Sequence, residues 1–271
     1  MTEDEQAAPR RARPGLIDVT VPNAARAADF LRGGSDHFAA DRKAALEVTA
    51  SVPAVERIPA EAGAFRRRTV RYLVAEAGIR QLVDIGNGLV PPGGTHETAL
   101  AVDPRCRVVY TDSDPLVLTR AQALIASAPV GSVSCVRGDI ADVDAIIAAA
   151  TPTLDLGQPA GVLLMSTLAH VPTMIAAARA VSSLMAVLPS GSHVVIYHLA
   201  SDLDPAMPAA ARQWNKTVPV PITLRNRDEV LALVAGLEVA EPGVVPVTEW
   251  RPDQAVLPPP VPVHGVVARK P

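Results

Sequence analysis

Cysteine is scarce in this sequence: only Cys106 and Cys135 occur among its 271 residues. Two cysteines cannot build a disulfide framework or a four-cysteine zinc site. So few cysteines are typical of a reducing compartment, and we expect the protein to be cytoplasmic. Aromatic residues make up only 3% of the chain, so aliphatic side chains must fill most of the core. That composition favours layered helices and sheet over an aromatic-rich β-sandwich.

The chain also lacks an excess of basic residues, since 25 Lys and Arg stand against 28 Asp and Glu. Proteins that bind nucleic acid by neutralising phosphates usually carry such an excess, so we expect no nucleic-acid partner. The uncharged stretch 160–178 is interrupted by Ser166, Thr167, His170 and Pro172. A buried strand, a polar loop and a helix explain it better than a membrane span does, and we expect no membrane partner.

The chain divides by composition into three parts. Residues 1–21 are rich in charge, proline and glycine and do not resemble a secretory signal, so we expect a disordered leader. Residues 22–78 have helical patterning that is broken at Gly33 and Gly34 and stops at Gly78, with Arg66 to Arg68 expected on a solvated helix face. Residues 79–271 form the predicted core domain.

Short apolar strands alternate with helices from residue 79 onward. We expect strands at 81–85, 107–111, 132–139, 160–165 and 192–201, with Asp114 as the N-cap of the helix after the second strand. This alternation requires a parallel sheet with right-handed crossovers. The apolar segments 237–247 and 261–268 would add two antiparallel edge strands. The prediction is an α/β, Rossmann-like fold with a mostly parallel seven-stranded sheet, helices on both faces and an N-terminal helical cover.

Glycines and acids gather at the ends of three predicted strands. The first strand ends in D-I-G-N-G, which contains Asp84, Gly86 and Gly88, while Asp112 ends the second strand and Asp139 the third. Ligands of open parallel sheets bind at these carboxyl ends. Glycine lets the backbone approach a ligand, Asp112 could accept both hydroxyls of a ribose, and Asp139 could meet an adenine amino group or cap the next helix. Together the three ends predict an adenosine-shaped site.

The glycine turn differs from the dinucleotide-binding pattern G-x-G-x-x-G. Its third glycine position is occupied by Pro91, which delays the next helix. Asp84, two residues before the first glycine, would repel a diphosphate but could meet a cationic amino-acid group. D-x-G-x-G followed by an acid at the next strand end resembles the cofactor motif of S-adenosylmethionine-dependent methyltransferases. We therefore expect S-adenosyl-L-methionine, and not NAD, as the cofactor.

Longer segments carry a resemblance to one family. They are FLRGGSDHFAADR (30–42), VRYLVAEAGIRQLVDIGNGL (70–89), THE (95–97), RVVYTDSDPLVL (107–118) and LEVAEPGVVPVTEWRPD (237–253). The chain resembles, from about residue 22 to 270, an actinobacterial family of S-adenosylmethionine-dependent methyltransferases long catalogued as a domain of unknown function. The resemblance implies a methyltransferase fold and a lid made by residues 22–78. Further cofactor contacts are then expected from Gly33, Gly34, Arg42, Asn87, Ser113, Ile140 and Ser166.

Two histidines are candidates for a catalytic base. His170 follows the fourth strand and His198 ends the fifth, and either could take a proton from an acceptor hydroxyl. The alternative, that each is a structural histidine, is the more common role for a histidine in such a position. The six histidines form no H-E-x-x-H pattern, and we expect no metal.

Two functions stay open. The first is methylation of a small molecule, such as an intermediate of a natural product in secondary metabolism, by a monomer or a homodimer. The second is an S-adenosylmethionine-binding protein that no longer methylates and serves as a regulatory or scaffold module, or catalyses another step. Departures from the family pattern at Asn87, Ser113 and His170 keep this second function open.

Overall fold

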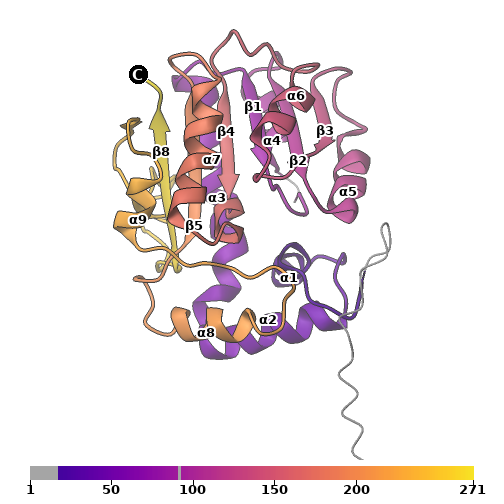
Figure 1. Cartoon of the computed structure of the whole chain (residues 1–271), viewed down its shortest axis with the longest axis vertical. Helices are drawn as coiled ribbons and strands as arrows, with labels where there is room; N and C mark the ends of the chain where they lie inside the picture. Colours follow the sequence, from indigo (N-terminus) through magenta and orange to yellow (C-terminus); the bar gives the residue numbers. More distant parts are fainter. Residues whose placement is uncertain (1–17, 91–92) are drawn as a thin grey trace, which may run out of the picture.

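One sheet forms the centre of the computed structural model, which describes residues 18–90 and 93–271 (Figure 1). Its strands run in the order β3-β2-β1-β4-β5-β8-β6, and β7 also pairs with β8. The first strands are parallel to one another, whereas β8 is antiparallel to β5. The bounds are β1 Gln81–Ile85, β2 Arg107–Asp112, β3 Val133–Arg137, β4 Gly161–Met165, β5 His193–Leu199, β6 Glu238–Val239, β7 Val245–Pro246 and β8 Val263–Arg269.

The predicted Rossmann-like fold with an antiparallel edge is confirmed, but the predicted number of seven strands is wrong. The described residues contain eight strands because two short strands, β6 and β7, share the position beside β8. Between them, the N–H of Gly243 donates to the carbonyl of Ala240 (2.9 Å) and closes a turn. The N–H of Ala240 still donates to the carbonyl of Val267 in β8 (2.9 Å), but the turn separates β6 from β7, so a single long edge strand does not form.

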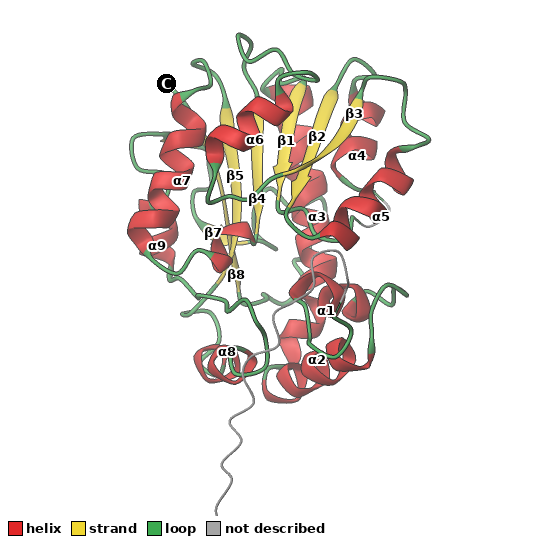
Figure 2. Cartoon of the chain, turned by 45° about the vertical axis from the view of Figure 1, so that its right-hand side comes forward, coloured by secondary structure: helices red, strands yellow, loops and turns green. Residues whose placement is uncertain are grey.

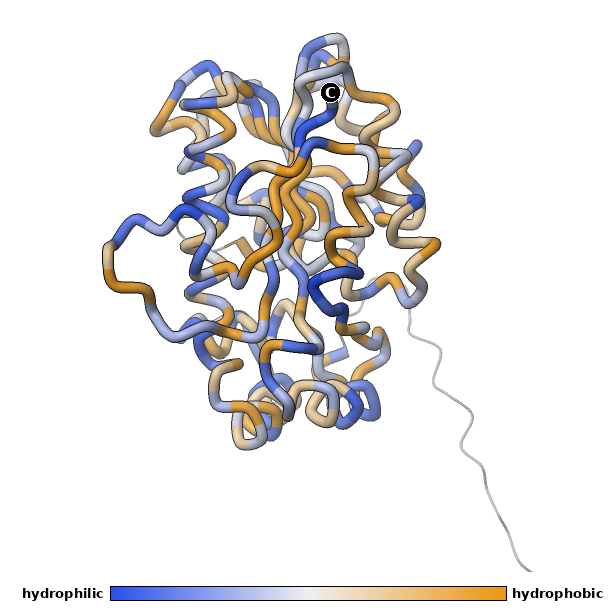
Figure 3. Tube along the Cα trace, turned by 90° about the vertical axis from the view of Figure 1, so that its left-hand side faces the viewer, coloured by the Kyte–Doolittle hydropathy of each residue, from blue (hydrophilic) through white to orange (hydrophobic). Residues whose placement is uncertain are grey.

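Helices cover both faces of the sheet (Figure 2). The helices α3 (Ile58–Arg71), α4 (Thr95–Val102) and α5 (Pro115–Ile125) lie on one face. On the other face lie α6 (Val143–Ala150), α7 (Met174–Ala186) and α9 (Arg227–Ala232). Alternate strand residues supply the two cores, so Leu82 packs toward α3 whereas Val83 packs toward α7. Strand β4, which lies between β1 and β5, is therefore apolar and buried along its whole length. In Figure 3 much of the hydrophobic colour lies in the interior of the molecule.

Helix starts follow local signals. Asp114 is the N-cap of α5, as predicted, and its side chain accepts a hydrogen bond from the N–H of Leu116. Asp142, and not Asp139, is the N-cap of α6. The helix α8 (Met207–Trp214) was not predicted. No helix in the described part of the chain is long and apolar enough to cross a membrane.

A second layer of helices lies over the carboxyl ends of the parallel strands (Figures 1 and 2). It consists of α1 (Ala24–Leu31), α2 (Ala39–Ser51) and α8, and we call these three helices the helical cover. Gly33, at φ +75°, makes the turn between α1 and α2. Trp214 of α8 packs against Ala44 and Ala45 of α2. Residues 1–17 of the predicted leader lie outside the described residues, so that prediction stays a prediction.

Candidate functional site

A cavity of about 510 Å³ lies between the helical cover and the carboxyl ends of the strands. Strand ends from β1, β2, β3 and β4 contribute polar residues to its lining, and α1, α2, α3, β5, α8 and the segment 218–222 contribute further residues. The predicted site residues that line it are Gly86, Asn87, Gly88, Asp112, Ser113, Asp139, Ile140, Ser166 and His170. The structure therefore brings most of the predicted site into one place.

The turn after β1 leaves its backbone open to this cavity. Gly86 (φ +64°) and Gly88 (φ +58°) both have left-handed backbone conformations that disfavour side chains. A Cβ atom on Gly86 would lie only 2.8 Å from Cγ2 of Thr167. The amide of Asn87 donates to the carbonyl of Gly88 (2.6 Å), which stabilises the turn. The backbone conformation and the closeness of Thr167 therefore both require glycine at position 86.

Asp112 presents a carboxylate to the same cavity from the end of β2. Its Oδ2 accepts from the N–H of Gly88 (3.1 Å), and its Oδ1 accepts from the N–H of Asp114 (2.9 Å). These bonds hold the carboxylate in place, and each oxygen keeps a lone pair for a ligand hydroxyl. Burial raises the pKa of Asp112, although the backbone N–H groups oppose that rise.

The end of β3 contributes the third predicted acid. Asp139 and the neighbouring Ile140 both line the cavity. The Oδ1 of Asp139 accepts from the N–H of Ala141 (2.9 Å), so its second oxygen has no intramolecular bond among the described residues. Asp139 is thus free to meet a ligand, because Asp142 performs the capping role.

Comparison with known proteins identifies the family. A model of the S-adenosyl methyltransferase family matches residues 10–271. The chain belongs to this family. It is similar to a DUF574 family protein from Streptomyces avermitilis, with 34% identity, a TM-score of 0.88, and coverage of 94% of this chain and 99% of that one. It is also similar to a candidate methyltransferase from Thermobifida fusca, with 32% identity, a TM-score of 0.87, and coverage of 93% and 96%. A comparison with curated protein sequences found no sequence that matches this chain.

The chain is therefore an S-adenosylmethionine-dependent methyltransferase, as its sequence motifs indicated. The residues of its cavity fit this cofactor. Gly86 and Gly88, which carry no side chains, line the cavity together with the carboxylate of Asp112. Among residues 18–90 and 93–271, no group of His, Cys, Asp or Glu is arranged to hold a metal ion.

Asp84 lies behind the glycine turn of the methyltransferase and does not line the cavity. Its side chain is 1% exposed, and its Oδ2 accepts from the hydroxyl of Thr95 at the start of α4 (2.6 Å). Its Oδ1 is buried without a hydrogen-bond partner. Burial raises the pKa of Asp84, while Arg66 and Thr95 act in the opposite direction. In this structure Asp84 joins β1 to α4.

The N-terminal segment contributes other residues to the cavity than those predicted. Gly33, Gly34 and Arg42 are exposed and lie outside the residues that line it. Arg32, which precedes them, does line the cavity, and its Nη2 donates to the carbonyl of Leu89 (3.0 Å). Arg32 belongs to the segment 30–42 that carries the family resemblance, but only the tertiary structure shows that this residue, and not the two glycines after it, lines the cavity.

The prediction that Arg66 to Arg68 lie on a solvated helix face is wrong for two of the three arginines. Arg66 and Arg68 are each 8% exposed, and only Arg67 faces solvent. Arg68 donates to the carbonyl oxygens of Trp250 (2.8 Å) and Val247 (2.5 Å). Arg66 instead lines the cavity. The segment 237–253, which packs over α3, buries a face that would otherwise be exposed.

The chain after β4 turns sharply beside the cofactor side of the cavity. Ser166 adopts a left-handed conformation (φ 70°), which is uncommon for a residue other than glycine, and its N–H donates to the carbonyl of Tyr197 (3.0 Å). A 3-10 turn, Thr167–His170, follows. It places His170 at the cavity with Nδ1 3.4 Å from the carbonyl oxygen of Pro221. Burial lowers the pKa of His170.

His198 does not face the cavity. It is fully buried, and its Nε2 lies 2.6 Å from Nη1 of Arg225. Burial lowers the pKa of His198 to about 4. Arg225 in turn donates to the carbonyl oxygens of Leu168 and Val171, both at 2.7 Å. The pair therefore holds the loop that carries His170, and His198 is a structural residue in this arrangement.

Proposed function

We propose that this methyltransferase transfers a methyl group to a small, largely apolar acceptor. One observation carries the proposal: the cavity that begins at the glycine turn continues into an apolar wall under the helical cover. The side chains of this wall come from α2, from the start of α3 and the turn before it, from β5, and from α8 and the segment after it. They include Val48, Val55, Ile58, Leu199, Met207, Trp214, Val218 and Ile222. A polar or polymeric acceptor would leave these groups in contact with water.

Residues at different strand ends would bind different parts of the cofactor: its ribose, its adenine and its amino-acid part. Asp112 would accept the ribose hydroxyls, and Asp139 with Ile140 would contact the adenine. Gly86 and Gly88 line the cavity and would lie beside the amino-acid part. When bound, S-adenosylmethionine supplies a methyl group already activated by its sulfonium. The protein then has to align the acceptor with that methyl group and exclude water.

His170 is the residue of the cavity placed to take a proton from an acceptor hydroxyl. Its lowered pKa favours the neutral imidazole at neutral pH. With the proton on Nδ1, which faces the carbonyl of Pro221, Nε2 is the atom left to accept. An acceptor nitrogen or carbon would depend less on this base. The helical cover keeps water away during the transfer.

The experiment is a methylation assay with S-adenosylmethionine and a panel of small apolar hydroxy and amino compounds, including intermediates of natural products. We expect methylated product and S-adenosylhomocysteine in equal amounts for at least one compound class, detected by mass spectrometry. A parallel measurement of melting temperature with S-adenosylhomocysteine reports binding by mass action. Stabilisation by the cofactor product without turnover on any compound would contradict this proposal and support the non-methylating alternative.

A further inference from the structure

Arg66 is a buried arginine whose guanidinium makes no contact with another described residue that would stabilise the fold. The residue is 8% exposed and lines the cavity, and its Nε is buried without a hydrogen-bond partner. No hydrogen bond or ion pair to its guanidinium is found in the described part of the chain. Arg68, two residues later on α3, is equally buried but donates to two backbone carbonyls. One buried arginine of α3 therefore has a structural role, and the other has unused donors.

A buried charged group without partners is unfavourable, because it loses its hydration and gains no bond in return. Asp84 is close enough for its charge to interact with Arg66, but the two side chains make no ion pair within 4.0 Å. The Oδ2 of Asp84 is bonded to Thr95 instead. Asp84 balances part of the charge of Arg66 but leaves its donors free.

A second arginine approaches the same part of the cavity from the helical cover. Arg32 on the C-terminal end of α1 lines the cavity, and burial lowers its pKa, with the charge of Arg66 acting in the same direction. Arg32 lies 3.5 Å from Asp29, whose Oδ2 also accepts from the N–H of Asp36 (2.7 Å). Asp29 therefore pairs with Arg32, whereas Arg66 has no ion-pair partner within 4.0 Å among the described residues, so a positive charge is left where α3 meets the cavity. The acids that line the cavity, Asp112 and Asp139, come instead from the ends of β2 and β3.

We propose that Arg66, assisted by Arg32, binds a carboxylate group inside the cavity. A guanidinium offers paired N–H donors that match the two oxygens of a carboxylate. The inference rests on the proposed function, because it assigns a ligand group within the same cavity. The carboxylate can come from two sources: the amino-acid part of the cofactor, or an apolar acid that serves as acceptor. In the second case the acceptor class narrows to small apolar carboxylic acids.

The test compares Arg66→Met with two matched arginine variants of the same helix. Arg67→Met removes an exposed charge, and Arg68→Met removes a buried charge that has structural bonds. Calorimetry would measure binding of S-adenosylhomocysteine and of 5′-methylthioadenosine, which lacks the amino-acid part. If the carboxylate belongs to the cofactor, Arg66→Met weakens S-adenosylhomocysteine roughly tenfold to hundredfold and leaves 5′-methylthioadenosine unchanged. Arg67→Met should change neither affinity.

The second arm uses protein saturated with S-adenosylhomocysteine and a panel of benzoate, phenylacetate and hexanoate, each paired with its amide. If the carboxylate belongs to the acceptor, wild-type protein binds at least one acid more tightly than its amide. Arg66→Met then removes that preference, while its affinity for S-adenosylhomocysteine stays as in the wild type. The proposal is overturned if Arg66→Met matches the wild type in both arms.

The melting temperature separates a ligand-binding role from a structural one. Without ligand, Arg66→Met should melt at or above the wild-type temperature, because it removes an unsatisfied buried charge. Arg68→Met should melt lower. A lower melting temperature for Arg66→Met would contradict the proposal, and Arg66→Lys then tests binding with the charge kept. Binding of S-adenosylhomocysteine without methylation of any acceptor would count against the proposed function and leave the Arg66 comparison intact.

Discussion

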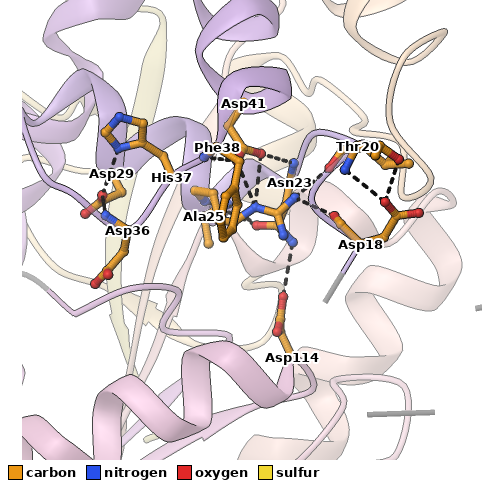
Figure 4. A network of polar contacts seen from close by, with 12 residues as sticks. Asp18, Thr20, Asn23, Ala25, Asp29, Asp36, His37, Phe38, Asp41 and Asp114 are labelled. Atoms are coloured by element: carbon orange, nitrogen blue, oxygen red, sulfur yellow. Dashed lines mark hydrogen bonds and ion pairs between the residues drawn. The ribbon is translucent and has the colours of Figure 1, made fainter. Parts of the chain in front are cut away.

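The Nδ2 of Asn23 donates to the Oδ2 of Asp114 over 3.2 Å and thereby joins two helix starts that are 91 residues apart in the sequence (Figure 4). Asn23 is the N-cap of α1, and Asp114 is the N-cap of α5. The backbone N–H of Asn23 also donates to Asp41, which forms a buried ion pair with Arg26. This network connects the helical cover to Asp114, which lies two positions after Asp112.

Substitutions of Asn23 test this connection. Asn23→Ser keeps an N-cap acceptor but loses the donor to Asp114, whereas Asn23→Asp keeps the cap and places two carboxylates side by side. We expect faster hydrogen exchange of the amides of α1 in both variants, and the larger effect in Asn23→Asp because the carboxylates repel. The lost hydrogen bond contributes about 1 kcal/mol. Unchanged exchange in Asn23→Asp would show that the cover is held without this bond.

Asp112 should determine much of the affinity for the cofactor. Asp112→Asn keeps the size of the side chain but removes the charge that strengthens bonds to ribose hydroxyls. We expect the affinity for S-adenosylhomocysteine to fall roughly tenfold to hundredfold in calorimetry. Asp144→Asn, an exposed acid on α6, is the control and should bind normally. Equal affinities for the two variants would argue against the proposed ribose contact.

His170→Gln should slow methyl transfer without changing cofactor affinity, if the acceptor is a hydroxyl. The expected loss in kcat is about 10²–10⁴-fold, the usual contribution of a positioned base. Because burial lowers the pKa of His170, the acid limb of the wild-type pH profile should have its midpoint below 6.5. Steady-state rates across pH 4.5–8 would show this limb in the wild type and not in the variant. A small loss in rate with an unchanged limb would exclude His170 as the base.

Acid should destabilise the fold partly through His198. Its pKa is lowered to about 4 in the folded protein, from an ordinary value of 6.5. Between these values the unfolded chain binds more protons, so this histidine makes the free energy of unfolding fall as pH decreases from 6.5 to 4. Each pKa unit corresponds to about 1.4 kcal/mol. Urea unfolding at a series of pH values would measure the slope.

A variant isolates this contribution from those of other groups. Burial raises the pKa values of Asp84 and Asp112, which gives a slope of opposite sign just above their ordinary value of 3.8. Subtracting the pH series of His198→Asn from that of the wild type removes these shared terms. The variant should be less stable at pH 7 and have a weaker pH dependence. A parallel pair of curves would mean that His198 titrates normally in the folded protein.

Local patterns were sufficient to predict most of the core domain. The strands at 81–85 and 107–111 were placed within one residue of their observed bounds, because short and mostly apolar runs that lead into glycine or acid are typical of buried parallel strands. The N-cap at Asp114 was also predicted, since capping depends on neighbouring residues alone. The helix α8 was missed although Pro208 lies in its first turn and Arg212 in its last turn; no side chain caps its start.

The sequence by itself determined the sheet, its glycine turn and the acids at the strand ends, because each depends on residues close together in the chain. The tertiary structure alone decided which arginine of Arg66 to Arg68 lines the cavity, and that His198 pairs with Arg225. Both outcomes depend on segments that are distant in sequence, such as Trp250 packing over α3. The sequence shows which residues can carry a charge, but their burial and their partners are decided only when distant segments pack together.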